Sequence, residues 1–106
     1  MKITYSIQVC NESRELYSLL NLLTRVIDDE DYIDVIVDSN NTTEKVELVL
    51  EHFKDRITVH KRAFDTFDKN CQFHIDVAEG EYVFHIDADE LPQQSLIKLL
   101  KQVISE

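Results

Sequence analysis

The sequence predicts an α/β fold, in which a mainly parallel sheet carries helices on both faces. Two observations support this prediction: apolar segments rich in β-branched residues alternate with amphipathic helical segments, and the 106 residues leave room for one core only. Neighbouring parallel strands need a long crossover connection, usually a helix, and such crossovers are right-handed. We therefore expect residues 1–106 to form a single domain.

The first strand and helix are predicted from the first 31 residues. Residues 3–9 form a β-branched run typical of a strand. Asn11 or Ser13 is expected to cap the helix that follows, and the charged residues 28–31 to form the turn that ends this unit. The apolar face of the helix is expected to contain Leu16, Leu19, Leu20, Leu23, Val26 and Ile27.

The same alternation then repeats. Residues 33–37 predict a second strand, and residues 57–60 a third, shorter one. Between them, Asn41 and Glu44 have the spacing of a capping box at the start of a helix. The apolar positions of that helix are Val46, Val49, Leu50 and Phe53.

The second half of the chain adds a helix, a strand and a last helix. Apolar residues at helical spacing predict a helix over residues 66–78, and Gly80 is expected to end it in a left-handed conformation. Residues 82–86 predict the fourth strand, and Pro92 suits the first turn of a fourth helix. That helix would bury Leu96, Leu99, Leu100, Val103 and Ile104.

Charge and composition exclude several classes of protein. The formal net charge of -10 repels phosphate backbones and anionic lipid, so we expect no nucleic-acid partner. No apolar run approaches the roughly 20 residues of a membrane span. Cys10 and Cys71 are too few for a disulfide framework, and we expect both to be reduced and buried in a cytoplasmic protein.

Three carboxylates follow the fourth predicted strand within four residues. Asp87, Asp89 and Glu90 repel one another, and a divalent cation with a diphosphate on its far side would neutralise them. The alternative is helix capping before Pro92. The two interpretations are about equally supported by this stretch alone. His85 is expected on the same sheet face as Asp87.

Asp38 follows the second predicted strand and favours a ligand site. It opens a polar run, residues 38–42, that could hydrogen-bond a base or ribose, although such runs more often form the N-cap turn of a helix. In open parallel sheets, ligands bind outside the carboxyl ends of the strands. Two acidic strand ends at one edge of the sheet therefore indicate a ligand site more strongly than one does.

Four motifs at these strand ends resemble family 2 glycosyltransferases with the GT-A fold. They are VCNE at residues 9–12, VDS at 37–39, AEGEYV at 78–83 and DADE at 87–90. The DADE and VDS motifs are most similar to the branch that includes lipopolysaccharide-core sugar transferases. The resemblance covers essentially the whole chain, in the expected order.

The resemblance implies a nucleotide-sugar site, with UDP-hexose as the expected ligand. Asp38 would accept a hydrogen bond from the base, Asp87 would lie near the ribose, and Asp89 would hold Mn²⁺ or Mg²⁺ against the diphosphate. The expected nucleotide-binding residues are Val9, Asn11, Glu12, Asp38, Arg62, Asp87 and Ala88, the metal ligands Asp87 and Asp89, and the catalytic residues Asp89 and Glu90.

The sequence also departs from the family pattern. Cys71 and Gln72 stand where the third helix usually has a basic residue and Asn, and the catalytic base has no counterpart beyond the nearby Glu90. We therefore expect transfer or slow hydrolysis of the sugar. The alternative is a non-catalytic binding or interaction module completed by a partner or by homo-oligomerisation. A phospho-acceptor receiver domain is disfavoured, because it requires paired acids where residues 10–12 read CNE.

Overall fold

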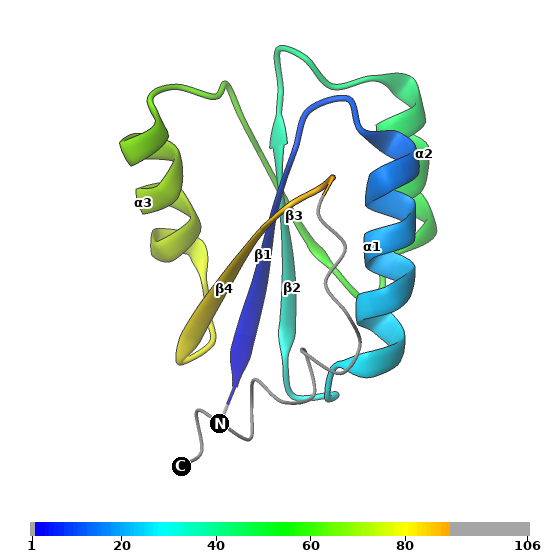
Figure 1. The fold of residues 1–106 in the computed structure, drawn as a ribbon, viewed down its shortest axis with the longest axis vertical. Coiled ribbons are helices and arrows are strands. Elements are labelled where there is room, and N and C mark those ends of the chain that lie inside the picture. The colour runs from blue at the N-terminus through cyan, green and yellow to red at the C-terminus, as the bar shows by residue number, and fades with distance from the viewer. Residues whose placement is uncertain (1, 90–106) are drawn as a thin grey trace.

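The computed structural model describes residues 2–89 (Figure 1). The predicted fourth helix, with Pro92, and the candidate Glu90 lie outside these residues. All four predicted strands and the first three predicted helices are confirmed, with small shifts at their ends. In chain order the elements are β1 (Ile3–Val9), α1 (Ser13–Val26), β2 (Tyr32–Asp38), α2 (Glu44–His52), β3 (Thr58–Arg62), α3 (Phe67–Val77) and β4 (Tyr82–Asp87).

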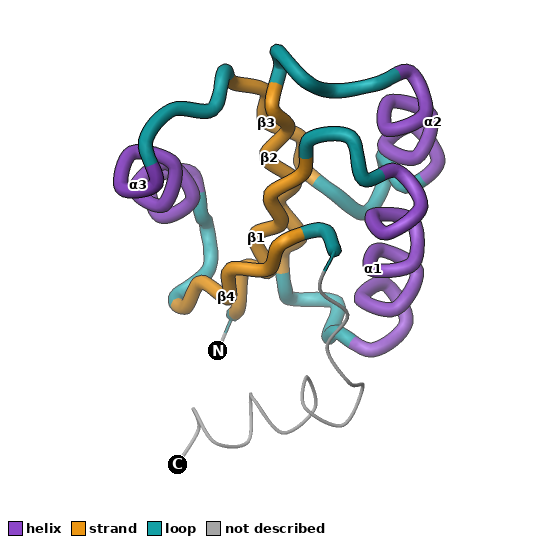
Figure 2. The backbone as a smooth tube through the Cα atoms, turned by 45° about the horizontal axis from the view of Figure 1, so that its top comes forward, coloured by secondary structure: helices purple, strands orange, loops and turns teal. Residues whose placement is uncertain are grey.

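The four strands form one parallel sheet in the order β3-β2-β1-β4. Helices α1 and α2 cover one face of the sheet and α3 covers the other (Figures 1 and 2). This is the predicted fold class. The chain builds outward from β1 to β3 and then returns to the other side of β1 for β4, so the strand order reverses between β1 and β4. Ligands bind at such reversals in open α/β sheets.

The hydrophobic core lies on the face covered by α1 and α2. Side chains alternate along a strand, and the odd-numbered residues of β1 and β2 point into this core. The leucines of α1 pack against them, as their helical spacing predicted. The fully buried members include Ile3, Tyr5, Ile7, Val9, Leu16, Leu19, Leu20, Leu23, Val35 and Val37.

The face covered by α3 is polar instead. The even-numbered residues of β1 and β2 include Ser6 and Asp34, both buried, and α3 contributes the buried His74. Hydrogen bonds and ring contacts connect side chains of α3 to this face of the sheet. We call the following set the polar layer: Ser6, Gln8, Asp34, His60, Arg62, His74 and His85.

Both predicted helix caps are wrong. The N-cap residue of α1 is Glu12 rather than Asn11 or Ser13, and in the described part of the chain its side chain caps no helical N–H. The N-cap of α2 is Thr43 rather than Asn41, and its hydroxyl accepts from Val46 N at 3.3 Å. Asn41 instead hydrogen-bonds to a strand-end carboxylate, which removes it from the helix terminus.

The prediction of a left-handed Gly80 is also wrong, since its φ is not positive. Its role is close approach. A Cβ at this position would lie 2.8 Å from both Thr4 N and Thr4 Oγ1, and 2.9 Å from Lys2 O. Gly80 N donates to Thr4 Oγ1 at 2.8 Å, so the segment before β4 lies directly against β1.

The prediction that Cys10 and Cys71 are buried is wrong, since both side chains are partly exposed. They lie at the strand-end edge and on α3, respectively, rather than in the apolar core. Within residues 2–89, no helix combines the length and apolar character needed to span a bilayer.

Candidate functional site

The carboxyl ends of the four strands meet at one edge of the sheet, which we call the carboxyl edge. Asp38, Arg62 and Asp87 are the last residues of β2, β3 and β4. The backbone N–H of Ala88 donates to Gln8 O at 3.0 Å, which keeps the segment after β4 alongside β1. The structure thus brings the predicted acidic strand ends to the same edge, as the parallel sheet required.

Asp38 connects three loops at this edge. Asp38 is buried, with 4% of the residue exposed. Oδ1 accepts from Asn40 N at 3.1 Å and from Phe64 N at 3.4 Å. Oδ2 accepts from Asn41 Nδ2 at 2.6 Å and from the Cys10 thiol at 3.7 Å. The donors come from the loops after β1, β2 and β3, so this carboxylate fixes their relative positions.

These contacts also determine the protonation states of Asp38 and Cys10. Burial alone would raise the pKa of Asp38, but the hydrogen bonds from Asn41, Asn40, Phe64 and Cys10 outweigh it and lower the pKa below 3.8. Burial and the nearby Glu12 and Asp38 carboxylates raise the pKa of Cys10 to about 11. Asp38 is therefore ionised and the Cys10 thiol neutral at pH 7. Cys10 acts as a hydrogen-bond donor to the carboxylate, a role that the sequence analysis missed.

The residues after β1 form a compact turn. Glu12 Oε1 accepts from Asn11 N at 2.8 Å and from Cys10 N at 3.0 Å. Of the other predicted nucleotide-binding residues, Val9 and Ala88 bury their side chains in the core. They can therefore present only backbone groups to a ligand at the carboxyl edge.

Asp87 and Asp89 are exposed at the end of β4 and in the turn after it. His85 Nε2 lies 3.8 Å from Asp87 Oδ1, so the two side chains share a face of β4 as predicted. No group of three or more His, Cys, Asp or Glu residues within 2–89 is arranged to hold a metal. Two exposed carboxylates are suitable hard oxygen donors for Mn²⁺ or Mg²⁺ if a diphosphate and water complete the ligand shell.

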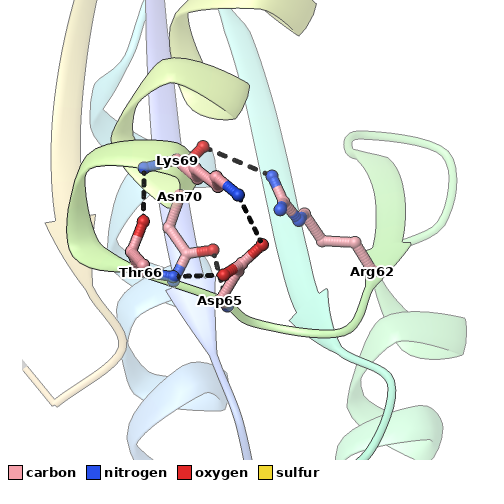
Figure 3. Close-up of polar contacts among 5 residues, drawn as sticks. All are labelled: Arg62, Asp65, Thr66, Lys69 and Asn70. Carbon is pink, nitrogen blue, oxygen red and sulfur yellow. Dashed lines mark hydrogen bonds and ion pairs between the residues drawn. The ribbon is translucent and has the colours of Figure 1, made fainter.

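Arg62 places a positive charge at the same edge and is held by α3. Its guanidinium lies 4.8 Å from the centre of the Phe73 ring, and Nη1 donates to Lys69 O at 3.4 Å. Figure 3 shows the start of α3, where Thr66 Oγ1 accepts from Lys69 N at 3.3 Å. Lys69 Nζ also lies 3.8 Å from Asp65 Oδ2.

The two departures in α3 have different surroundings. Cys71 is partly exposed, whereas Gln72 Nε2 donates to Asp76 Oδ1 at 2.7 Å along the helix surface. Lys69, two residues before Cys71, supplies a cation near the start of the helix that the sequence analysis did not select. In the sequence, Lys69 could have been noticed as a basic residue in the first turn of a predicted helix, where acidic residues are more usual.

His74 is a further residue that the sequence analysis did not select. It is 2% exposed, its Nδ1 hydrogen-bonds with Ser6 Oγ, and its Nε2 lies 3.4 Å from Gln8 Oε1. Burial and the nearby His85, Arg62 and His60 lower the pKa of His74 to about 4. The alternation of Ser6 and Gln8 with apolar residues was the sequence signal that a polar side chain would cover this face.

Comparison with known proteins identifies both the family and the fold. The family model described as "Glycosyl transferase family 2" matches residues 6–106. No curated protein matches the chain at the level of sequence.

The solved structures that resemble this one include the following two. The structure of S. aureus TarS residues 1–349 has a TM-score of 0.78 at 21% identity, over 99% of this chain and 32% of that one. A mannosyltransferase from Pyrobaculum calidifontis, PcManGT, in complex with GDP-Man and Mn²⁺, has a TM-score of 0.73 at 16% identity, over 93% of this chain and 31% of that one. The chain thus spans about a third of the length of either relative.

Proposed function

Because the chain belongs to glycosyl transferase family 2 and has the α/β fold of a GT-A nucleotide-binding half, we propose that it binds a nucleotide sugar with a divalent metal at its carboxyl edge. The observation that carries this proposal is the placement of Asp38, Asp87 and Asp89 on one edge of a parallel sheet, with Asp87 and Asp89 beside the reversal of strand order between β1 and β4.

In this proposal, Asp87 and Asp89 hold Mn²⁺ or Mg²⁺. The metal, when bound, supplies Lewis acidity that stabilises the charge on the departing nucleoside diphosphate. A protein with a net charge of -10 needs such a cation to accept a diphosphate beside its carboxylates. The Mn²⁺ in the complex of the similar mannosyltransferase supports this choice of metal.

The nucleoside is assigned to the other residues of the carboxyl edge. Asp38 is ionised and its carboxylate already accepts four hydrogen bonds, so in this proposal the N3–H of uracil takes the place of one of these donors, of which the Cys10 thiol at 3.7 Å is the most distant. Asp87 would lie near the ribose, and Arg62 near the diphosphate. The remaining proposed nucleotide contacts are Asn11, Glu12 and the backbone of Val9 and Ala88.

For catalysis, we assign metal-assisted departure of UDP to Asp89 and the role of base to Glu90. Water needs the least positioning of any acceptor, so slow release of UDP from a UDP-hexose is the expected activity of this chain alone. We propose that acceptor-specific transfer involves a partner or a second copy of this chain. We propose a cytoplasmic location for this activity, since two cysteines are too few for a disulfide framework.

Isothermal titration calorimetry tests the proposal directly. The ligands are UDP, CDP, GDP, UDP-glucose and GDP-mannose, each with and without Mn²⁺. We expect UDP to bind in a Mn²⁺-dependent manner, and to bind about ten-fold more tightly than CDP, because cytosine lacks the N3 proton and would leave Asp38 unmatched, at a cost of about 1 to 3 kcal/mol.

The Asp89→Asn variant is expected to lose at least about ten-fold in Mn²⁺-dependent UDP affinity, because it removes an anionic oxygen ligand. Asp29→Asn is the matched control, since Asp29 is exposed in the loop between α1 and β2, at the opposite edge of the sheet. Unchanged UDP affinity in Asp89→Asn would refute the metal assignment. Preference for GDP over UDP would refute the base assignment and leave metal-dependent binding standing.

A further inference from the structure

Four side chains on β1 and β4 form a two-by-two grid beneath α3. The register pairs Ser6 with His85 and Gln8 with Asp87, and residues two apart on a strand lie on the same face. His85 and Asp87 therefore stand side by side on β4, with Ser6 and Gln8 beside them on β1. Asp87, the corner nearest the carboxyl edge, is a proposed ligand of the metal.

His74 of α3 contacts the other three corners of this grid. Its Nδ1 hydrogen-bonds with the Ser6 hydroxyl, and its Nε2 lies 3.4 Å from Gln8 Oε1. Its ring packs against the ring of His85, with 4.3 Å between centroids and 37° between planes. One buried side chain of the helix thus fixes the surroundings of Asp87 without being a ligand itself.

The protonation state of His74 agrees with these contacts. Its pKa of about 4 makes the ring neutral at pH 7, with one N–H and one lone pair. Gln8 Oε1 can only accept, so Nε2 carries the proton and donates, and Nδ1 accepts from the Ser6 hydroxyl. Both ring nitrogens are therefore matched, which holds the ring in one orientation.

From this arrangement, and on the premise of the proposed function, we propose that His85 is a positioning residue for Asp87 and that His74 holds His85 in place. His85 Nε2 lies 3.8 Å from Asp87 Oδ1, and the two side chains are 34% and 54% exposed. Stacking against His74 restricts the rotation of the His85 ring. A ring held beside Oδ1 limits the orientations that the carboxylate can present to a ligand.

Partners of this kind, which orient a ligand without touching the metal, typically change metal affinity by about 10- to 100-fold. The His85–Asp87 pair is partly exposed and its separation is long, so we expect an effect below this range, roughly three- to ten-fold. The expected effect is on Mn²⁺ affinity in the presence of UDP, with little effect on the stability of the fold.

Mn²⁺ titration of the UDP-saturated protein tests the inference. His85→Ala should weaken Mn²⁺ binding roughly three- to ten-fold, and His85→Gln, which keeps a polar side chain of similar reach beside Asp87, should restore most of the loss. His74→Phe keeps a ring against His85 and should bind Mn²⁺ more tightly than His74→Ala. His52→Ala is the matched control, because His52 lies at the end of α2, over the other face of the sheet.

A second readout does not depend on binding. The ¹⁵N signals of the His85 ring should move in Asp87→Asn and in His74→Ala, while those of His52 stay unchanged. Unmoved His85 signals in both variants would refute the positioning role, as would full Mn²⁺ affinity in His85→Ala. If the wild-type protein binds neither UDP nor Mn²⁺, the proposed function and this inference both fail. Intact wild-type binding with no loss in His85→Ala overturns this inference alone.

Discussion

At Gly80, the absence of a side chain allows the segment before β4 to lie against β1. The space that a Cβ would occupy is bounded mainly by backbone, with Thr4 N at 2.8 Å and Lys2 O at 2.9 Å. Backbone atoms in a central strand cannot move aside as the end of a flexible side chain can. This position therefore limits how closely the segment before β4 approaches the start of β1.

We expect Gly80→Ala to reduce the free energy of unfolding by about 1 to 3 kcal/mol, because overpacking outweighs the entropy gained by removing a glycine. Urea unfolding followed by circular dichroism measures this change. Glu79→Ala, at the neighbouring position, should alter the free energy by no more than about 0.5 kcal/mol. A Gly80→Ala protein as stable as the wild type would show that the segment moves away without cost.

Single residues also show which parts of the site are visible in sequence. Asp38 and Asp87 could be placed at one edge because parallel strands of a βα alternation end on the same side. The donors to Asp38 from Cys10 and Phe64 could not, because they depend on which loops the strand order brings together. The roles in nucleotide and metal binding remain predictions.

At the scale of elements, α3 differs from the other helices in what it covers. Its buried His74 sits on the polar layer, where Asp34 Oδ2 lies 3.9 Å from His60 Nε2. The neighbours of His74 include His85, Arg62 and His60, all of which oppose a positive charge on the ring. Acid should therefore weaken the attachment of α3 to the sheet.

The pH dependence of stability follows from the pKa of His74. Its folded pKa of about 4 lies below the ordinary 6.5, so the unfolded chain binds the proton more readily. The contribution of His74 to the free energy of unfolding is therefore complete above pH 6.5 and is lost as the pH falls toward 4. We expect a loss of about 2 kcal/mol between pH 7 and pH 5, measured by urea unfolding.

His74→Phe is the control, because it removes this titration and keeps a ring on the sheet. Burial raises the pKa of Asp34, and that shift acts in the opposite direction, since it favours the folded state as the pH falls. The difference between wild type and His74→Phe therefore isolates His74. Equal pH dependence in the two proteins would show that His74 is not the group responsible.

Elements could be predicted to different degrees. Strands β1 and β2 were predictable because they are buried runs rich in β-branched residues. Strands β3 and β4 are largely exposed, and their short runs were recognised because they continue the alternation of strand and helix. The N-cap of α2 could not be predicted, because Asn41 hydrogen-bonds to Asp38 across a turn whose shape the sequence does not specify. The spacing of the apolar residues in α3 predicted a helix correctly, but Ile75 is exposed and the buried position belongs to His74.

The whole molecule is therefore built from two unequal faces. Almost all of the buried apolar side chains in residues 2–89 lie between the sheet and helices α1 and α2, and the polar layer lies beneath α3. Apolar burial contributes most of the stability of a domain, and regions with few buried apolar contacts open before the rest. We therefore expect the α3 face, which flanks the proposed ligand site, to open before the face covered by α1 and α2.

Native-state hydrogen exchange should show whether the two faces of the sheet differ in stability. Leu20 is completely buried in α1 and Leu48 is 65% exposed on α2, so they form a matched pair of leucines on helices. Leu20→Ala should lower the exchange free energy of amides in β1, β2 and α1 by about 2 to 5 kcal/mol, because those amides exchange through global unfolding. Amides of α3, which exchange through local opening, should change much less, and Leu48→Ala should leave all of them within about 0.5 kcal/mol. An equal loss of protection in α3 and β1 would mean that α3 opens only with the whole molecule, and that the polar layer binds the helix as firmly as the apolar core does.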